Sequence, residues 1–219
     1  MAYGESLPYL NPCSPEKVAA LLQPHIRHDA RLADIGCGRG DTLQWLAAHT
    51  AYELHGVESD SEMLAFAERQ CPSVALVYGE ADSLPYADGY VDALLMECVF
   101  SLLTDPAKAI AELARVIRQQ GILLITDLYT RLDAHVQIDQ NELLKNLYTR
   151  AEMEAYFNAQ AGGRWALLPD GFMDCTKELQ TMAAQMIMDD KTNDGRNRET
   201  LKTLRVAKVG YGMWLWRRV

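Results

Sequence analysis

The 219-residue chain has few basic residues and no apolar run that approaches the length of a membrane span. Its 21 Lys and Arg stand against 30 Asp and Glu, which gives a formal net charge of -9. Because binding to a nucleic-acid backbone depends on clustered Lys and Arg, this balance argues against nucleic acid as the main partner. We therefore expect a soluble, cytoplasmic protein with a small-molecule substrate, while the composition leaves the oligomeric state open.

The chain also lacks the features of a secreted or metal-binding protein. Its N-terminus has no charged region followed by an apolar one, so no signal peptide is expected. The five cysteines are odd in number and lack C-x-x-C spacing, which indicates neither a disulfide framework nor a metal site. We expect all five to be reduced thiols: Cys13, Cys37, Cys71, Cys98 and Cys175.

Apolar runs alternate with amphipathic stretches, which is typical of βαβ units and a mostly parallel sheet. The length suits one α/β domain over residues 1–219. The predicted strands are 31–35, 52–57, 74–78, 91–96, 121–128, 165–175 and 209–218. The predicted helices are 41–49, 59–70 with Ser59 or Asp60 as N-cap, 105–119 with Pro106 in its first turn, 142–160 and 176–190. The polar stretch 189–200 is expected to be a mobile loop.

The stretch RLADIGCGRGDT, residues 31–42, places glycines at positions 36, 38 and 40 directly after a strand. Glycines there let the backbone turn sharply and approach a ligand closely. A dinucleotide-binding turn would read G-x-G-x-x-G, with the pyrophosphate at the following helix N-terminus. Here its last glycine is replaced by Asp41, whose charge would repel phosphates. The turn therefore favours an adenosine ligand without phosphates, such as S-adenosylmethionine, over a nicotinamide dinucleotide.

Glu58 ends the second predicted strand, 58 − 36 = 22 residues after the first motif glycine. Nucleotide-binding βαβ units place a ribose-binding carboxylate at about this spacing, roughly 20 residues on. A carboxylate can accept hydrogen bonds from both ribose hydroxyls. The alternative is that Glu58 merely begins a helix.

Several ordered motifs in residues 31–128 resemble those of the class I S-adenosylmethionine-dependent methyltransferases, and within them the ubiquinone and menaquinone biosynthesis group. They are ADIGCGRGD, GVESD, and the run from GEADSLPYADGYVDALLMECVF to GILLITDLY. The sequence departs from the family at Gln120, where a second glycine is frequent, and at Glu80, where Asp or Asn is usual. The resemblance implies a Rossmann-like sheet of order 3-2-1-4-5-7-6 with an antiparallel seventh strand.

The resemblance also assigns residues to the cofactor. Asp34 and the motif glycines would surround its amino-acid part, Glu58 would hold the ribose, and Glu80 with the Ala81 backbone would face the adenine. Met96, Glu97 and Cys98 would lie along the methionyl group near the reactive methyl. The complete predicted set is Asp34, Gly36, Cys37, Gly38, Gly40, Glu58, Ser59, Glu80, Ala81, Asp82, Met96, Glu97 and Cys98, with no metal ligand.

Methyl transfer from a sulfonium is an in-line displacement, so positioning the acceptor supplies most of the acceleration. If the acceptor carries a proton, a general base helps. The candidates are Glu97, Asp127, Tyr129 and His135, with Asp127 and Tyr129 expected just past the fifth strand and facing the cleft. For each, a helix cap or hydrogen-bonded structural role is the alternative, and no catalytic residue is assigned.

Two other functions remain open. Cys98, joined by Cys13 or Cys175, could bind a soft thiol or metalloid acceptor. The chain could also be a non-catalytic module that binds the cofactor. Substrate choice should reside in segments outside the core. We expect these to be an N-terminal cap, residues 1–30, and helical lid insertions at 129–148 and 176–207. In the last of these, Met182, Met186, Ile187 and Met188 could line an adaptable apolar pocket or simply pack in the core.

Overall fold

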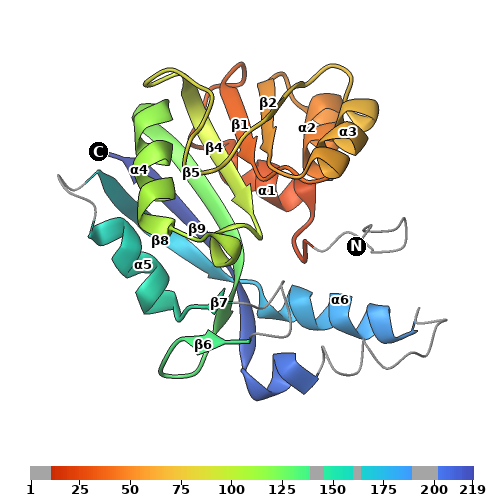
Figure 1. Cartoon of the computed structure of the whole chain (residues 1–219), viewed down its shortest axis with the longest axis vertical. Coiled ribbons are helices and arrows are strands. Elements are labelled where there is room, and N and C mark those ends of the chain that lie inside the picture. The colour runs from red at the N-terminus through yellow and green to blue at the C-terminus, as the bar shows by residue number, and fades with distance from the viewer. Residues whose placement is uncertain (1–10, 139–145, 160–163, 189–201) are drawn as a thin grey trace.

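A seven-stranded sheet runs through the centre of the molecule (Figure 1). The structure, a computed structural model, describes residues 11–138, 146–159, 164–188 and 202–219. The strands are β1 (Arg31–Ile35), β2 (Glu53–Glu58), β3 (Ala75–Tyr78), β4 (Val91–Glu97), β5 (Ile117–Thr130), β8 (Trp165–Asp174) and β9 (Val209–Arg218). Their order is β3-β2-β1-β4-β5-β9-β8, and β9 is antiparallel to both of its neighbours. The predicted sheet order and the antiparallel last strand are confirmed.

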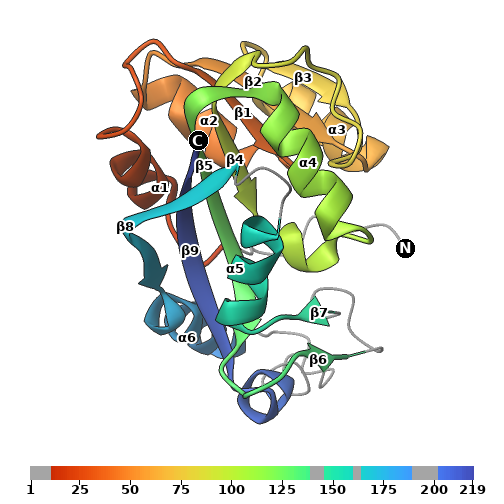
Figure 2. The ribbon, with the colours of Figure 1, turned by 90° about the vertical axis from the view of Figure 1, so that its left-hand side faces the viewer.

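Helices cover both faces of this sheet. They are α1 (Pro15–Leu22), α2 (Asp41–His49), α3 (Ser61–Gln70), η1 (Phe100–Leu102), α4 (Pro106–Val116), α5 (Arg150–Asn158) and α6 (Thr176–Met188). Figure 2 shows α4 and α5 on one side and α1 and α6 on the other. The Asp60 side chain caps α3 by accepting from the N–H groups of Glu62 and Met63, which decides between the two N-caps considered for this helix. Asp105 caps α4 in the same way.

Two apolar clusters, one on each face, account for the nearly continuous apolar runs of the central strands. On β5, Leu124 packs into the cluster that includes α1 and α2, whereas Leu123 and Ile125 pack into the cluster that includes α4 and α5. All three side chains are fully buried. Burial on both faces is the reason a parallel strand shows a run rather than an alternation of apolar residues.

The fifth strand is longer than predicted at both ends. It begins at Ile117, within the stretch predicted to continue the preceding helix, and ends at Thr130. Asp127 and Tyr129 therefore lie inside β5 and not beyond it, because β9 pairs with this strand as far as Thr130. The partner strand β9 lies far along the chain, since even its nearest paired residue is 209 − 130 = 79 positions away, so local periodicity does not reveal how far β5 extends.

The prediction of a helix over 142–160 is wrong for residues 146–149, the described part of its first half. Asn146–Leu147 forms β7, which pairs with β6 (Val136–Gln137). The helix starts at Arg150 because Thr149 and Glu152 form a reciprocal capping box, in which each side chain accepts the other's backbone N–H.

The expected lid over 129–148 is not helical where the structure describes it. Residues 129–138 and 146–148 contain the end of β5 and the strands β6 and β7. In the second expected lid, α6 is confirmed as far as Met188, and residues 202–206 are helical. The loop expected at 189–200 lies outside the described residues. In the described part of the chain, no helix is long and apolar enough to cross a bilayer.

Candidate functional site

The glycine turn between β1 and α2 is built on three left-handed backbone positions. Gly36, Gly38 and Gly40 have φ values of +75°, +55° and +79°. A residue with a side chain would strain the backbone at these positions. The N–H groups of Gly36 and Cys37 donate to the Val57 carbonyl at 2.8 and 3.0 Å, which fixes the turn to the end of β2.

The three glycines differ in what surrounds them. A Cβ on Gly36 would lie 2.4 Å from the Val99 side chain, and one on Gly40 would lie 2.9 Å from the Cys71 sulfur. A Cβ on Gly38 would meet no atom within 4 Å. Gly36 and Gly40 are thus required by protein packing, whereas Gly38 faces open space that a ligand can enter.

Glu58, the predicted ribose ligand, lies across the turn from Gly38. Its Oε2 accepts the Gly38 N–H at 2.7 Å, and its Oε1 accepts the N–H groups of Ser59 and Asp60, both at 2.9 Å. The side chain is largely buried, at 9% exposed. Three backbone donors hold the carboxylate in one orientation, and Oε2 keeps capacity for a further hydrogen bond. Ser59 contributes its backbone to this arrangement.

Asp34 on β1 is a second acid at the same place. Asp34 is 3% exposed, and its Oδ1 has no hydrogen-bond partner among the described residues. Burial, followed by the nearby charges of Glu97 and Glu58, raises the pKa of Asp34 well above its usual range. A buried carboxylate oxygen without a partner is costly. Its position beside two other acids indicates a site for a cationic group.

Glu97, at the end of β4, is held by the N-terminal segment and by α2. Its Oε2 accepts from the side-chain amide of Asn11, and the Thr42 side chain also hydrogen bonds to it. Burial raises the pKa of Glu97 to about 7, against the lowering effect of the Thr42 hydrogen bond. The carboxyl can therefore gain or lose a proton near neutral pH, which is the property that a general base requires.

A chain of hydrogen bonds continues from Asn11 to β9 and β5. The Tyr211 hydroxyl lies 2.7 Å from Oδ1 of Asn11 and 2.6 Å from Oγ1 of Thr126. Because a carbonyl oxygen cannot donate, Tyr211 gives its single proton to Asn11 and accepts the proton of Thr126. Cys98 also contacts this hydroxyl, at 3.7 Å. The protons of this hydrogen-bond chain all point the same way. Each group donates to the next in the order Thr126, Tyr211, Asn11, Glu97.

Cys98 itself has φ +56°, a conformation that is rare for a residue with a side chain. Its N–H donates to the Thr126 carbonyl of β5 at 2.7 Å, directly after the last residue of β4. Strain of this kind persists where the surroundings enforce it, and it concentrates at functional sites. Met96, the other predicted neighbour of Glu97, is fully buried in the core.

The residues predicted for the adenine lie in the turn after β3. Glu80 is exposed and pairs with Ser83 in an isolated β-bridge, and Ala81 packs against the cluster on the α4 face. Asp82 forms an ion pair with Lys108 on α4 at 2.9 Å. Asp82 is therefore occupied in a surface contact, while Ala81 is the member of this group that reaches the protein interior.

The other base candidates have partners that fit structural roles. Asp127 is fully buried and accepts from the N–H and the hydroxyl of Ser101 at 2.8 and 2.9 Å. Tyr129 donates to Asp174 at 3.1 Å, and its ring lies edge-on to Trp214. Burial raises the pKa of Asp127 to about 6. Because Asp127 holds η1 through its two hydrogen bonds from Ser101, its contacts nevertheless agree with a structural role.

His135, the fourth candidate, stacks on Tyr148 with ring centroids 4.6 Å apart. Its Nε2 is buried without a hydrogen-bond partner among the described residues. Of the four base candidates, only Glu97 has a contact to Asn11 and an electrostatic influence on Asp34.

The soft-acceptor alternative gains no support from the cysteines. Cys13 and Cys175 are hydrogen bonded to each other, whereas Cys98 contacts the Tyr211 hydroxyl. No group of three or more His, Cys, Asp or Glu within the described ranges is placed to hold a metal ion.

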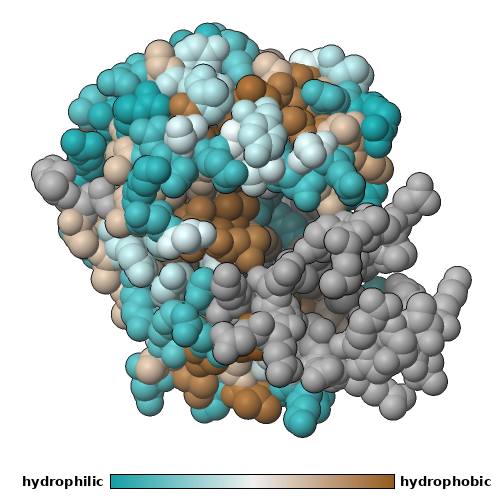
Figure 3. Space-filling model, in the orientation of Figure 1, coloured by the Kyte–Doolittle hydropathy of each residue, from teal (hydrophilic) through white to brown (hydrophobic). Residues whose placement is uncertain are grey.

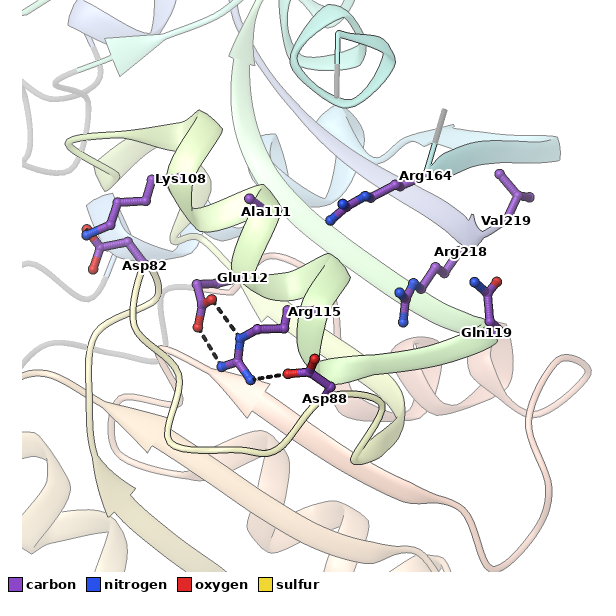
Figure 4. A pocket seen from close by; sticks show the side chains of 10 residues that line it. All are labelled: Asp82, Asp88, Lys108, Ala111, Glu112, Arg115, Gln119, Arg164, Arg218 and Val219. Carbon is purple, nitrogen blue, oxygen red and sulfur yellow. Dashed lines mark hydrogen bonds and ion pairs between the residues drawn. The ribbon is translucent and has the colours of Figure 1, made fainter. Parts of the chain in front are cut away.

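A groove of about 660 Å³ lies elsewhere, beside α4 and the end of β9 (Figure 4). Its central cation, Arg115, is bonded to Glu112 at 2.7 Å and to Asp88 at 3.0 Å. Apart from Asp82, the groove contains none of the predicted site residues. By contrast, apolar side chains gather over η1 in a hollow near the middle of the face in Figure 3. Leu102 of η1 is 44% exposed.

Sequence reasoning missed four residues of the site: Asn11, Thr42, Thr126 and Tyr211. Asn11 stands in a segment with no periodicity, and Thr42 reads as an ordinary first-turn residue. Thr126 and Tyr211 lie in predicted strands, but they meet only through the pairing of β5 with β9. The one indication in the sequence that Thr126 and Tyr211 belong to the site is that each is a polar residue inside an otherwise apolar strand.

Comparison with known proteins identifies related sequences and folds. The methyltransferase domain family matches residues 33–125. The ubiquinone/menaquinone biosynthesis C-methyltransferase of Campylobacter jejuni is 28% identical over 113 residues, which are 49% of this chain and 48% of that protein. The chain thus spans about half the length of the curated relatives that it matches.

Solved structures share the fold over nearly the whole chain. Geranyl diphosphate C-methyltransferase from Streptomyces coelicolor, solved with Mg²⁺, geranyl diphosphate and S-adenosylhomocysteine, has a TM-score of 0.75 and 18% identity, covering 93% of this chain and 80% of that one. The [4+2]-cyclase SpnF has a TM-score of 0.73 and 18% identity, covering 93% and 81%. At this identity the likeness concerns the fold, and the cyclase illustrates that one fold can carry different chemistry.

Proposed function

We propose that the chain is a class I S-adenosylmethionine-dependent methyltransferase, which transfers a methyl group from S-adenosylmethionine to a small-molecule acceptor. The match of the methyltransferase domain family to residues 33–125 and the likeness to the Campylobacter jejuni C-methyltransferase support this proposal. The observation that carries this proposal is the acidic cluster of Asp34, Glu58 and Glu97 beside the open side of Gly38, in which Asp34 and Glu58 are buried. When bound, S-adenosylmethionine would supply a sulfonium methyl group that the acceptor attacks in line, with the thioether S-adenosylhomocysteine as the leaving group.

The residues of the cluster fit the chemical groups of this cofactor. The unpartnered Oδ1 of Asp34 and the Glu97 carboxylate suit its ammonium group, because a cation offsets the cost of burying their charges. Glu58, fixed by three backbone donors, suits a ribose diol. Gly38 leaves room for the ligand, since a Cβ there would point into open space.

Glu97 is the candidate base if the acceptor carries a proton. Burial has already raised its pKa to about 7, so it can accept a proton at neutral pH. Asn11 and Thr42 orient its carboxyl group, and the Asn11 amide is oriented in turn by Tyr211. Asn11, Thr42 and Tyr211 are positioning residues in this proposal.

The chain segments at the end of β5 and before β9 are proposed to set the acceptor pocket. Residues 129–148 and 176–207 flank the carboxyl end of β5 and the start of β9 in the chain, and Leu179 and Ala183 of α6 are buried against the rest of the fold. The exposed Leu102 of η1 adds an apolar surface. We propose that these parts order around bound ligands and exclude water.

Binding of the cofactor tests this proposal directly. In titration calorimetry, S-adenosylhomocysteine, the cofactor without its methyl group, is expected to bind one equivalent per chain. A nicotinamide dinucleotide is expected not to compete, because Asp41 would lie near its phosphates. If the protein binds the dinucleotide more tightly than S-adenosylhomocysteine, this proposal is wrong and a dehydrogenase function is favoured.

A further inference from the structure

Two buried cysteines meet where the N-terminal segment packs against the start of α6. Cys13 precedes α1 and is 1% exposed, and Cys175 directly precedes α6 and is 0% exposed. Both side chains belong to the same buried apolar cluster, and each is the other's hydrogen-bond partner across 175 − 13 = 162 positions of sequence. The contact is therefore created by the fold and not by local chain geometry.

A charged pair lies directly against one of the two sulfurs. Nζ of Lys17 is 3.2 Å from Sγ of Cys175 and 2.6 Å from Oε1 of Glu178. The Cys175 carbonyl accepts the N–H groups of Glu178 and Leu179, so the cysteine also stands at the positive end of α6. A nearby ammonium and a helix N-terminus both stabilise a thiolate.

These surroundings distinguish Cys175 from the other thiols. Hydrogen bonds from Cys13 and Lys17 lower the pKa of Cys175 to about 7, although burial opposes them. Burial raises the pKa of Cys37, Cys71 and Cys98. Cys175 is thus the described cysteine with the largest thiolate fraction at neutral pH, and Cys13 is in position to resolve its oxidation.

We propose that Cys13 and Cys175 form a dithiol site that hydrogen peroxide converts to a disulfide. The Cys175 thiolate attacks one peroxide oxygen, the O–O bond breaks, and a sulfenic acid forms as hydroxide leaves. The Cys13 sulfur then attacks Sγ of Cys175, the S–O bond breaks, and water leaves with the Cys13 proton. Overall, two thiols and one peroxide give one disulfide and two waters. Peroxide is the fitting oxidant because it is near the size of water and both thiols are buried.

The product would tie the N-terminal segment to α6 and to the network around Glu97. The N–H of Cys13 donates to Oδ1 of Asn11 at 3.0 Å, and the N–H of Cys175 donates to the Tyr211 carbonyl at 2.7 Å. Both cysteines are therefore bonded to residues that orient Glu97. Closing so long a loop restricts the unfolded chain, so oxidation is expected to raise the thermal midpoint by about 5 to 15 °C.

Peptide mapping without reduction after peroxide treatment at pH 7 tests this site. A peptide pair joined through Cys13 and Cys175 is expected to accumulate before Cys37 or Cys71 is oxidised. The rate should follow an ionisation near pH 7. Lys17→Met, which keeps the length of the side chain but removes the charge, should slow the reaction about tenfold at pH 7, and Lys17→Arg should restore most of it. In Cys13→Ser, the Cys175 sulfenic acid should persist, and it should react with dimedone when the oxidised protein is unfolded in the presence of that reagent.

Two results would overturn the proposal. One is oxidation of Cys37 or Cys71 without a Cys13–Cys175 linkage in the folded wild-type protein. The other is a linkage whose rate shows no ionisation between pH 6 and 8. Both are measured on the wild-type chain, so poor folding of a variant cannot obscure them, and neither depends on cofactor binding.

Discussion

The backbone N–H of Gly38 donates a 2.7 Å hydrogen bond to Oε2 of Glu58, which makes the glycine turn and the acid at the end of β2 one structural unit. Ligand contacts made by either residue therefore depend on the other. The following predictions test this unit and the groups around it.

Replacing Glu58 by Ala is expected to weaken S-adenosylhomocysteine binding by about 1.5 to 3 kcal/mol, the range for hydrogen bonds to a charged group. Glu53→Ala is the matched control, since Glu53 lies at the other end of β2 in an exposed ion pair with Arg31. Calorimetry should give wild-type affinity for the control. An equal loss of affinity in both variants would show that Glu58 does not contact the ligand.

Substitutions at Gly36 and Gly38 are expected to have different effects, mainly on stability at Gly36 and mainly on ligand binding at Gly38. Both positions have positive φ, so each Ala variant bears backbone strain of about 1 to 2 kcal/mol. Gly36→Ala also forces its Cβ toward Val99 and should lose further stability in urea denaturation. Gly38→Val should retain its fold by circular dichroism yet bind S-adenosylhomocysteine at least about tenfold more weakly, because its side chain occupies the open space. Unchanged affinity in folded Gly38→Val would end the assignment of this turn to the cofactor.

Glu97 is expected to make stability and binding respond to pH in opposite directions. Its pKa is raised from 4.5 to about 7 by burial, so the folded state keeps a proton that the unfolded state has lost between these values. The free energy of unfolding from this group therefore falls as pH rises through this window. Binding of a cationic ligand favours the ionised carboxyl, so affinity should rise over the same range with release of a proton.

Glu97→Gln separates these two effects. The variant should be more stable than the wild type at pH 8, since no buried charge forms, while it binds S-adenosylhomocysteine more weakly and with a flatter pH dependence. Thermal unfolding and calorimetry in buffers of different ionisation enthalpy measure both. A variant that loses stability at pH 8 would contradict this account of Glu97.

Tyr211→Phe and Tyr129→Phe form a matched pair. Each removes a hydroxyl that donates to one side chain, but only Tyr211 connects through Asn11 to Glu97. Both variants should lose about 1 to 3 kcal/mol of stability. Only Tyr211→Phe should shift the pH dependence of cofactor binding. Identical binding profiles in the two variants would show that the Tyr211 hydroxyl has a structural role alone.

Hydrogen exchange tests the proposed cover. Residues 129–148 and 176–207 are expected to gain protection when S-adenosylhomocysteine binds. If they exchange as slowly as β4 and β5 in the free protein, they belong to the core. The acceptor pocket would then have to be sought at the N-terminal segment around Tyr3 and Tyr9.

The sequence was most informative where structure is decided by neighbouring residues. The turn at Gly36 to Gly40 and the acid at Glu58 were predictable because strand, turn and strand follow one another in one βαβ unit. The start of α5 was also readable, since Thr149 and Glu152 have capping-box spacing, although the apolar periodicity before them was interpreted as helix.

What depends on distant pairing could not be predicted. Tyr211 reaches Thr126 only because β9 lies beside β5, and Asn11 reaches Glu97 only because the N-terminal segment lies against the end of β4. Such contacts leave no periodic pattern in either segment. The position of Tyr129 was missed for the same reason, because the β9 pairing extends β5 past the predicted end of that strand at residue 128.

Transfer of a labelled methyl group tests the central claim most directly. The wild-type protein is incubated with limiting methyl-labelled S-adenosylmethionine and a panel of small metabolites, with Gly38→Val as the control that binds the cofactor more weakly. The account predicts label on a small-molecule product and formation of S-adenosylhomocysteine with the wild type, and much less of both with Gly38→Val. Tight binding of S-adenosylhomocysteine by a wild-type protein that labels no acceptor would contradict it and indicate a non-catalytic cofactor-binding module.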